Sequence, residues 1–467
     1  DKLPDPNVLF SPRFGFNWDV TGTRSTQVRG GTGIFTGRPA YVWISNQIGN
    51  TGVLTGFESL TNTRRRPFHP DPNRYKPTNV TGAPASSYEL ALTDPNFRFP
   101  QQWRSNIAID QKLPWWGLIG TAEFIYSRDI NGIYYINANL PAAQTKFNGV
   151  DQRPRWTSNR LNNAPGNQIA NAIVLKNESK GYAWNISATI EKPWTDGFFA
   201  KLGYSYGIAR NTVDPGSIAF GSWSTNQHSG DPNNPGVGYS AAFGGGSPGH
   251  RIFLAASYRA EYFDFGATTI SLFWEGSRGT YLGYGNYSFT FSNDMNGDGG
   301  TNDLIYIPRD ASELQFQQYT ASGTTFTVQQ QIDAFNKYIA NDPYLSKNRG
   351  KYAERGAAML PMVFRADLSI AQEFFTNILE KRNALEFRID LLNVGNLLNK
   401  KWGVGNRYRF TSNNSVQPLQ YMGVDANGVP ILRFRNIGNQ LPTDPLEQTT
   451  EITDVFRIQL GVRYTFN

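Results

Sequence analysis

The last twelve residues, 456–467 (FRIQLGVRYTFN), alternate strictly between apolar and polar side chains. Phe, Ile, Leu, Val, Tyr and Phe occupy every second position, and the positions between them carry Arg457, Gln459, Gly461, Arg463 and Thr465. Alternation with a period of two places one kind of side chain on each face of a β-strand. Chain ends are usually polar and frayed. A strand whose apolar face continues to the end therefore needs an apolar neighbour or an apolar solvent.

The same alternation recurs along the whole chain. It predicts about eleven strands and an all-β fold. Besides the final strand, the alternating or glycine-containing segments are residues 13–20, 25–35, 102–110, 120–126, 182–191, 198–206, 251–259, 267–275, 364–370 and 385–392.

The connections between these segments are alternately short and long. Short turns are expected at 21–25, 112–117, 192–197, 260–264 and 375–382, and long polar stretches at 36–101, 128–181, 210–249, 276–361 and 395–453. This rhythm is typical of a transmembrane antiparallel β-barrel with short periplasmic turns, long extracellular loops, an apolar outer band and a polar interior. In such a barrel the last strand faces lipid, which explains its apolar face. A soluble carbohydrate-binding β-sandwich also alternates, but it would have short loops at both ends.

Composition narrows the classes further. The 467 residues are 39% hydrophobic, and no apolar run reaches the roughly 18 residues of a transmembrane helix. With no cysteine, neither a disulfide framework nor a thiolate metal site can form. The +7 formal charge comes from 44 basic and 37 acidic residues without a basic stripe, so it is interpreted as solubility and lumen polarity and predicts no nucleic-acid partner.

Strand parity gives the expected orientation. If the short turns are periplasmic, the first strand runs toward the periplasm. With eleven strands the last one runs in the same direction and ends in the periplasm. An open sheet of this size would leave two unpaired edges in lipid, where unsatisfied backbone groups are costly. We therefore expect residues 1–467 to be the C-terminal part of a barrel that is nicked, split or continued by further chain.

Four stretches carry a family resemblance. Residues 11–47, 248–259, 294–308 and 390–403 resemble the C-terminal barrel of TonB-dependent outer-membrane receptors, specifically the Oar-like group. The resemblance implies about half of a 22-stranded barrel, with the N-terminal plug and first strands outside this chain. It implies a transporter of a large or scarce solute in a Gram-negative outer membrane. The implied partners are the remaining half of the barrel with its plug, the TonB energy-coupling complex through the N-terminal part, and the barrel-assembly machinery.

The terminal strand also resembles the assembly signal of bacterial outer-membrane proteins, carried here by Tyr464 and Phe466. The departure is Asn467, since the aromatic residue usually comes last. An alternative function from another class is a structural or secretion-associated barrel that acts as a binding platform for exported proteins or surface lipoproteins. The expected capture surfaces are the extracellular loops 210–249 and 281–310, which are rich in Asn, Gly and aromatic residues.

Charged residues of the last strands are expected to face the lumen and to hold a plug rather than select a solute. They are Arg365, Asp367, Glu386, Arg388, Asp390, Arg457 and Arg463.

One motif suggests a metal. In the hexapeptide DMNGDG, Asp294, Asn296 and Asp298 have the alternate spacing that lets oxygen ligands converge on Ca²⁺, and Asp303 adds a carboxylate. Ile305 stands where an EF-hand carries its bidentate Glu. The alternative is a polar turn with no ion. Calcium here would brace a loop.

Catalysis is not expected. The three histidines, His69, His228 and His250, occur singly, and no carboxylate pair is placed for acid and base roles. We therefore predict no enzyme, no catalytic residue and no cofactor other than Ca²⁺. Residues 327–342 are expected to form a short helix with Ile332, Phe335 and Ile339 on one face. This face is expected to pack inside an extracellular loop, and the alternative is that it docks a partner.

Overall fold

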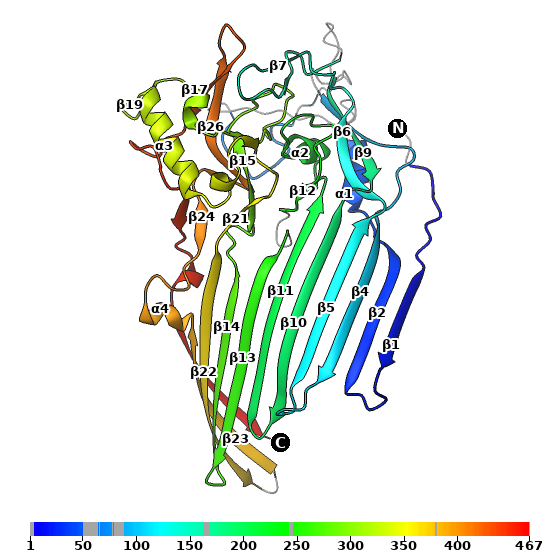
Figure 1. Ribbon diagram of the computed structural model, residues 1–467, viewed down its shortest axis with the longest axis vertical. Coiled ribbons are helices and arrows are strands. Elements are labelled where there is room, and N and C mark those ends of the chain that lie inside the picture. Colours follow the sequence, from blue (N-terminus) through cyan, green and yellow to red (C-terminus); the bar gives the residue numbers. More distant parts are fainter. Residues whose placement is uncertain are drawn as a thin grey trace.

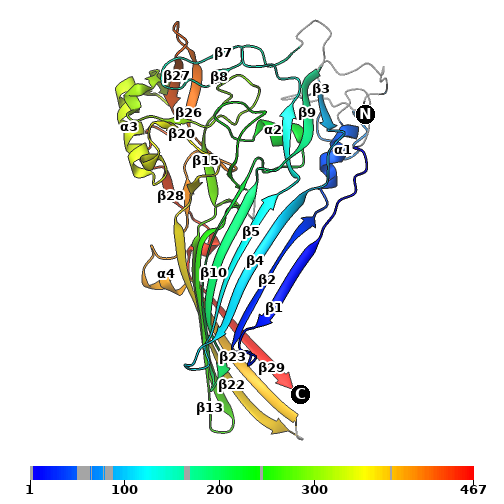
Figure 2. The ribbon, with the colours of Figure 1, turned by 45° about the vertical axis from the view of Figure 1, so that its right-hand side comes forward.

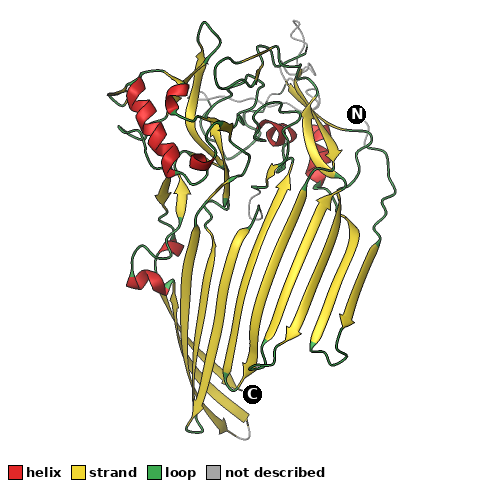
Figure 3. Cartoon of the chain, viewed as in Figure 1, coloured by secondary structure: helices red, strands yellow, loops and turns green. Residues whose placement is uncertain are grey.

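The computed structural model describes residues 4–49, 64, 66–76, 78, 88–161, 169–241, 246–378 and 381–466. Long strands form one curved wall, and the short helices α1 to α3 lie with most of the loops beyond one end of it (Figures 1 and 3). None of the described helices is long and apolar enough to cross a membrane.

The wall contains eleven long strands, each antiparallel to the next, as the alternation predicts. In spatial order they are β1 (Arg13–Asp19), β2 (Thr26–Thr36), β4 (Gln101–Lys112), β5 (Ile119–Asp129), β10 (Tyr182–Thr195), β11 (Phe198–Asn211), β13 (Gly249–Tyr262), β14 (Gly266–Arg278), β22 (Met362–Ile378), β23 (Lys381–Leu392) and β29 (Arg457–Phe466). Among the described strands, β1 and β29 each have a single neighbour, so the barrel is not closed. The short β12 (Gly238–Tyr239) pairs only with β11.

The register divides the side chains between the two faces of the wall. Between β14 and β22, Leu272 lies opposite Leu368 on one face, and Ser271 lies opposite Ser369 on the other. The apolar face is open: the side chain of Leu460 is 75% exposed and that of Phe14 is 67% exposed. Soluble monomers rarely expose a continuous apolar surface of this extent. The apolar face is therefore the lipid-facing side of a transmembrane barrel wall.

The hairpin turns lie at the end of the wall away from the folded loops, and the C-terminus lies at the same end (Figure 2). The turn expected at 192–197 is shorter than predicted, because β10 continues past a bulge to Thr195. Asp196 and Gly197 then close the hairpin with φ values of 53° and 73°, as a two-residue turn between twisted strands requires. A Cβ at Gly197 would stand 2.3 Å from the carbonyl oxygen of Arg259. Of the turn expected at 375–382, residues 379–380 lie outside the described part of the chain.

The long loops contain much more structure than their polarity predicts. In the described residues a six-stranded sheet forms around β15 (Asn286–Phe291), a three-stranded sheet forms around β9 (Ile169–Glu178), and four further sheets have two strands each. Further strands of the loops are β3 (Tyr88–Thr93), β6 (Gly132–Asn137), β7 (Thr145–Lys146), β8 (Pro154–Arg155), β16 (Tyr306–Ile307), β17 (Gln315–Phe316), β18 (Tyr319–Ala321), β19 (Thr324–Phe326), β20 (Lys351–Tyr352), β21 (Ala358–Met359), β24 (Asn406–Tyr408), β25 (Thr411–Ser412), β26 (Ser415–Val424), β27 (Pro430–Phe434) and β28 (Leu446–Gln448).

The helices are short. They are α1 (Tyr41–Gly49), α2 (Ala219–Ser224), α3 (Val328–Asn341) and α4 (Val394–Leu398), with 3₁₀ turns at Ala311–Glu313, Leu345–Lys347 and Ile452–Asp454. The predicted helix is α3. Thr327 caps it through a reciprocal hydrogen-bond pair with Gln330, which satisfies backbone donors of the first turn. Phe335 is fully buried and Ile332 packs beside it, as the helical spacing predicts.

The loops enclose two apolar cores. The larger one joins β15, α3 and β27 through Phe289, Phe335 and Phe434. The second packs Trp223 of α2 against Ile173 of β9. We call the folded loops, residues 36–101, 128–181, 210–249, 276–361 and 395–453 where they are described, the loop unit.

Candidate functional site

A cavity of about 690 Å³ opens within the loop unit, near α2. This volume lies within the roughly 300–1,000 Å³ range of ligand pockets. Its walls come from residues 214–227 with Ala241, from Tyr284, Thr301 and Arg355, and from residues 412–417. Both predicted capture loops therefore contribute to one cavity. The third wall was missed, although the Asn and Ser run TSNNS (411–415) is a turn signal.

Side-chain hydrogen bonds fix the wall formed by residues 214–227. The Ser222 hydroxyl accepts from the Gly216 N–H at 3.0 Å and donates to the Ile218 carbonyl at 2.8 Å. The indole N–H of buried Trp223 donates to Asn233 Oδ1 at 3.0 Å. These bonds hold the short α2 against the second core, so this wall has a defined shape.

The wall at 412–417 is attached to the first wall across a long sequence separation. Gln227 Nε2 donates to Asn414 Oδ1 and to Ser415 Oγ, both at 3.1 Å. At the tip of this hairpin, Asn413 has a φ of 51°, a left-handed conformation that Asn tolerates better than most residues. The cavity is therefore assembled by tertiary contacts.

The two charged residues that line the cavity are occupied by each other and by the backbone. Arg355 is only 4% exposed and its Nη1 lies 3.7 Å from Asp214 Oδ2. Asp214 also accepts from Ser240 Oγ and from the N–H of Ala241, each at 2.7 Å. Burial lowers the pKa of Arg355, with Asp214 acting in the opposite direction. The charges thus hold the walls together, and hydroxyl and amide groups remain to face a ligand.

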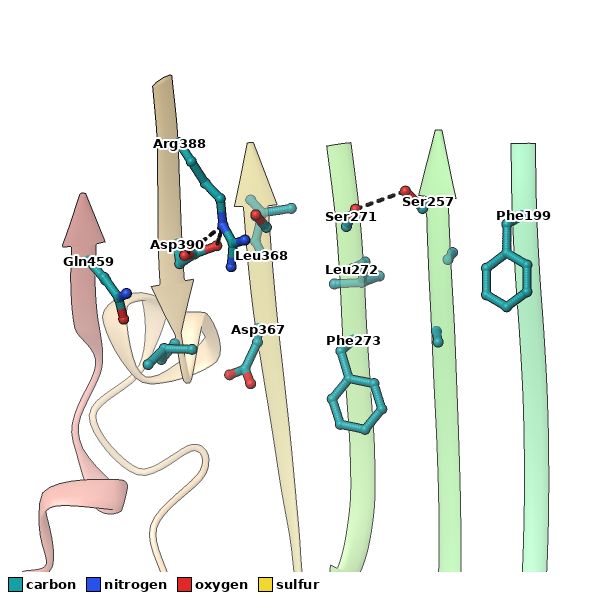
Figure 4. Close-up of a pocket in the computed structure, with 14 residues that line it drawn as sticks. Phe199, Ser257, Ser271, Leu272, Phe273, Asp367, Leu368, Arg388, Asp390 and Gln459 are labelled. Carbon is teal, nitrogen blue, oxygen red and sulfur yellow. Dashed lines mark hydrogen bonds and ion pairs between the residues drawn. The ribbon is translucent and has the colours of Figure 1, made fainter. Parts of the chain in front are cut away.

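A second hollow, of about 400 Å³, lies on the inner face of the wall (Figure 4). Arg388 Nε donates to both carboxylate oxygens of Asp390, at 2.8 and 2.9 Å. The Ser257 and Ser271 hydroxyls lie 2.8 Å apart. Asp367 Oδ1 accepts from the Asn393 N–H at 2.7 Å. The polar residues predicted to face the lumen share this face, and several already pair with one another.

The remaining predicted lumen charges have different neighbours. Arg365 Nη2 lies 3.2 Å from Asp454 Oδ1. Glu386 lies opposite Arg463 in the register of β23 and β29. Arg457 begins β29 opposite Leu392. Whether these charges hold a plug stays a prediction.

The DMNGDG motif forms a buried turn in the loop unit. Asp294 accepts backbone N–H groups from Gly297 at 2.7 Å and Gly299 at 2.9 Å. Asn296 Nδ2 donates to Asp298 Oδ2 at 3.0 Å. Asp303 Oδ2 accepts from the N–H groups of Met295, at 2.8 Å, and Asn296, at 3.2 Å. The structure therefore brings the four predicted ligands together.

Two basic side chains lie against this turn. Fully buried Arg153 binds Asp303 Oδ1 through Nη1 at 3.1 Å and Asp151 Oδ2 through Nη2 at 2.9 Å. His228 Nε2 lies 3.1 Å from Asp298 Oδ2. Arg153, His228 and the turn come from three different long loops, so their contacts join these loops. Neither Arg153 nor His228 was predicted, because nothing in the sequence places them beside the motif.

The electrostatics of the turn follow from burial and these partners. Burial, with the charges of Asp298 and Asp303, raises the pKa of Asp294 to about 7. Burial opposes ionisation of Asp298, but the hydrogen bond and charge of His228 hold its pKa below the usual value. Burial works against protonation of His228, and Asp298 outweighs it, so the pKa of His228 is raised. Among the described residues, no three His, Asp or Glu side chains are placed to hold a metal. Calcium binding here stays a prediction.

The family follows from comparison with known proteins. A family model described as outer membrane β-barrel domain matches residues 4–407. The chain belongs to this family. The match agrees with the apolar outer face of the wall, and it gives the protein an outer-membrane location.

Solved structures of larger proteins are similar at low identity. The outer membrane transporter YddB from Escherichia coli has a TM-score of 0.42 and 10% identity, over 98% of this chain and 40% of that one. A mutant of the ferric enterobactin receptor PfeA from Pseudomonas aeruginosa has a TM-score of 0.36 and 8% identity, over 98% and 39%. The siderophore receptor PirA from Acinetobacter baumannii has a TM-score of 0.34 and 8% identity, over 87% and 38%. The chain thus spans about two fifths of their lengths. No curated protein matches it.

The terminal aromatics of this outer membrane β-barrel point to the lipid side. Tyr464 and Phe466 are exposed, and their ring centroids are 5.9 Å apart. The Tyr464 hydroxyl donates to Asn383 Oδ1 at 2.6 Å. An apolar face therefore continues along β29 to its last described residue. Recognition by an assembly machinery stays a prediction.

The three histidines of the barrel lie in separate environments. His228 is buried beside Asp298, and the His250 Nδ1 lies 2.8 Å from the Tyr204 hydroxyl near the start of β13. His69 Nδ1 accepts from the Asp71 N–H at 3.1 Å in a local turn. These contacts are structural, and none of the three histidines lines the loop cavity or the hollow of the inner wall.

Proposed function

We propose that this chain is the C-terminal part of a TonB-dependent outer-membrane transporter of the Oar-like group. It would take up a large or scarce solute through a plugged barrel. The proposal depends on the arrangement of the two parts of the chain. The loop unit, which contains a polar cavity, lies at one end of the wall, and the wall has a polar inner face and an apolar outer face. Such an arrangement suits capture outside the cell followed by passage along the wall.

The proposal includes an orientation and a set of partners. The short turns and the C-terminus would be periplasmic, and the loop unit extracellular. The open edges of β1 and β29 would pair with the remaining strands of the same barrel, since unpaired backbone groups are costly in lipid. The plug would occupy the polar inner face, the TonB complex would act through the N-terminal part, and the barrel-assembly machinery would insert the whole.

A second candidate is a structural or secretion-associated barrel that serves as a binding platform for exported proteins or surface lipoproteins. The observation in its favour is the loop unit itself, whose two apolar cores give it a persistent surface. A platform needs such a surface and needs no energised passage.

Removal of the energy coupler separates the two functions. Cells that carry the complete receptor, with and without TonB, would be compared for surface binding and for accumulation of labelled solutes from the growth medium. The transporter predicts binding in both strains and accumulation only with TonB. Equal accumulation in both strains would contradict the transporter. A stoichiometric protein partner held by the loops, without TonB-dependent flux, would favour the platform.

We also propose that the turn at 294–299 binds Ca²⁺ through Asp294, Asn296 and Asp298. Binding would require Asn296 and Asp298 to exchange their mutual hydrogen bond for the metal, while Asp303 stays with Arg153. A ligand present at about 100 times its Kd stabilises the folded state by about 2.7 kcal/mol. Calcium should therefore raise the melting temperature of the loop unit. Asp294→Asn should remove this response, and Asp333→Asn, at an exposed position of α3, should keep it. An equal response of both variants would contradict the proposal.

A further inference from the structure

Several side chains that line the loop cavity have hydrogen-bonding groups that the protein itself does not use. Within the described part of the chain, their hydroxyl or amide groups bond to no other residue. They are Ser217, Thr301, Ser412, Asn413 and Gln417. Hydroxyl and amide groups each offer both donors and acceptors. The cavity therefore offers a ligand uncharged groups that can both donate and accept hydrogen bonds.

The charged side chains of the lining already have partners within the protein. Asp214 and Arg355 are the charged residues of the lining, and they pair with each other. Arg355 Nη2 also donates to Asn211 Oδ1 at 2.8 Å. Recognition of an anionic chelate or a phosphate would need free guanidinium or ammonium groups. The lining as described offers no spare cation for this purpose.

The apolar part of the lining is small. Ile218 is 59% exposed, and Tyr284, the aromatic residue among the lining residues that are described, packs against the larger core. Backbone hydrogen bonds of 2.9 and 3.0 Å between Tyr281 and Tyr284 fix the tyrosine. A ligand with weakly apolar ring faces and many polar edges fits such a surface, whereas a peptide with large apolar side chains would need deeper apolar pockets.

We propose that the cavity binds an uncharged oligosaccharide. Its hydroxyls would be bound by the hydroxyl and amide groups of the lining, and a ring face would pack against the exposed side chain of Ile218. Ser217, Thr301, Ser412 and Asn413 are exposed, so a ligand must replace their hydrogen bonds to water with donors and acceptors of its own. The inference rests on the proposed function, because it names the class of solute that the transporter would capture.

The test is a binding measurement on the complete receptor purified in detergent. The probes are short neutral oligosaccharides of glucose, mannose and xylose, with a sulfated oligosaccharide, a neutral peptide and a ferric catecholate chelate as comparison ligands. The test variant is Asn413→Gly with Gln417→Ala; glycine at 413 removes the amide without straining the positive φ. The matched control is Asn427→Ala, an exposed Asn in another hairpin of the loop unit.

We expect saturable binding of at least one neutral oligosaccharide, a loss of about tenfold or more in affinity in the double variant, as one or two lost hydrogen bonds imply, and unchanged affinity in the control. No binding of any neutral oligosaccharide would overturn the inference, as would preferred binding of the charged ligands or the peptide, or equal affinity of all three proteins. Binding as expected without TonB-dependent accumulation would contradict the transporter and leave the cavity's ligand class standing.

Discussion

The wall and the loop unit place their apolar residues in opposite ways. In the wall Leu460 is 75% exposed, whereas Ile305 in the loop unit is fully buried. The charged side chains of the two parts also differ in exposure. Arg388 of the wall faces the open lumen, and Arg153 of the loop unit is sealed between two aspartates. One chain thus contains a part built for lipid outside and water inside, and a part built like a soluble domain.

This difference indicates which substitutions should destabilise each part. In the wall a polar substitution is harmless on one face and costly on the other, because lipid cannot hydrogen-bond to it. In the loop unit the costly substitutions are those that leave a buried charge without its partner. The following predictions use this contrast, from the largest expected effect to the smallest.

The largest effect is expected from Arg153→Met in the loop unit. It leaves Asp151 and Asp303 buried without their cation, and breaking a buried pair in this way costs about 3–5 kcal/mol. The loop unit should lose protection in hydrogen exchange while the strands of the wall keep theirs. The control is Arg309→Met, which removes an exposed arginine whose pair with Glu313 spans 3.9 Å and costs under about 1 kcal/mol. Equal exchange in the two variants would show that the buried pairs do not hold the loops.

A smaller effect is expected from Leu272→Arg in the wall. Leu272 lies near the middle of β14 on the lipid side, where an arginine costs about 2–4 kcal/mol. The adjacent Ser271→Arg, on the lumen side, should cost much less. The free energy of unfolding from bilayers measures both. If Ser271→Arg is the more damaging, the assignment of the two faces is wrong.

The smallest effect on stability is expected at the end of β29. Phe466→Ala should barely change the stability of an inserted barrel, but it should lower the amount that reaches the outer membrane several-fold if the terminal aromatic is an assembly signal. Val462→Ala, on the same face of the same strand, should leave that amount unchanged. Similar losses for both variants would mean that β29 contributes only apolar surface.

The wall could be predicted from sequence because the patterns that indicate its strands lie within short segments of the chain. A period of two is visible within any single strand, and the alternation of short and long connections requires no tertiary contact. Eleven strands and their faces follow from these two features. The helix α3 was predictable for the same reason, since Thr327, Ile332 and Phe335 carry a local pattern.

The loop unit could not be predicted because its contacts are distant. The apolar run at 304–307 is too short to show a period, and the alternating YSFTF at 287–291 lies inside a long polar stretch. Its strand β15 pairs in parallel with β26, over a hundred residues later. The partners of the predicted calcium motif, Arg153 and His228, come from other loops. The cavity was half predicted: its two capture loops were named, but the wall at 412–417 and the Gln227–Asn414 contact depend on the fold.

Site-directed spin labelling along β14 tests the central claim most directly. The chain has no cysteine, so single cysteines at successive positions from 268 to 275 can be labelled without a background. In bilayers, labels at even positions should be accessible to oxygen, which concentrates in lipid, and labels at odd positions to a water-soluble nickel complex. This alternation would establish a wall between lipid and an aqueous lumen. Equal accessibility of both sets to the nickel complex would contradict it.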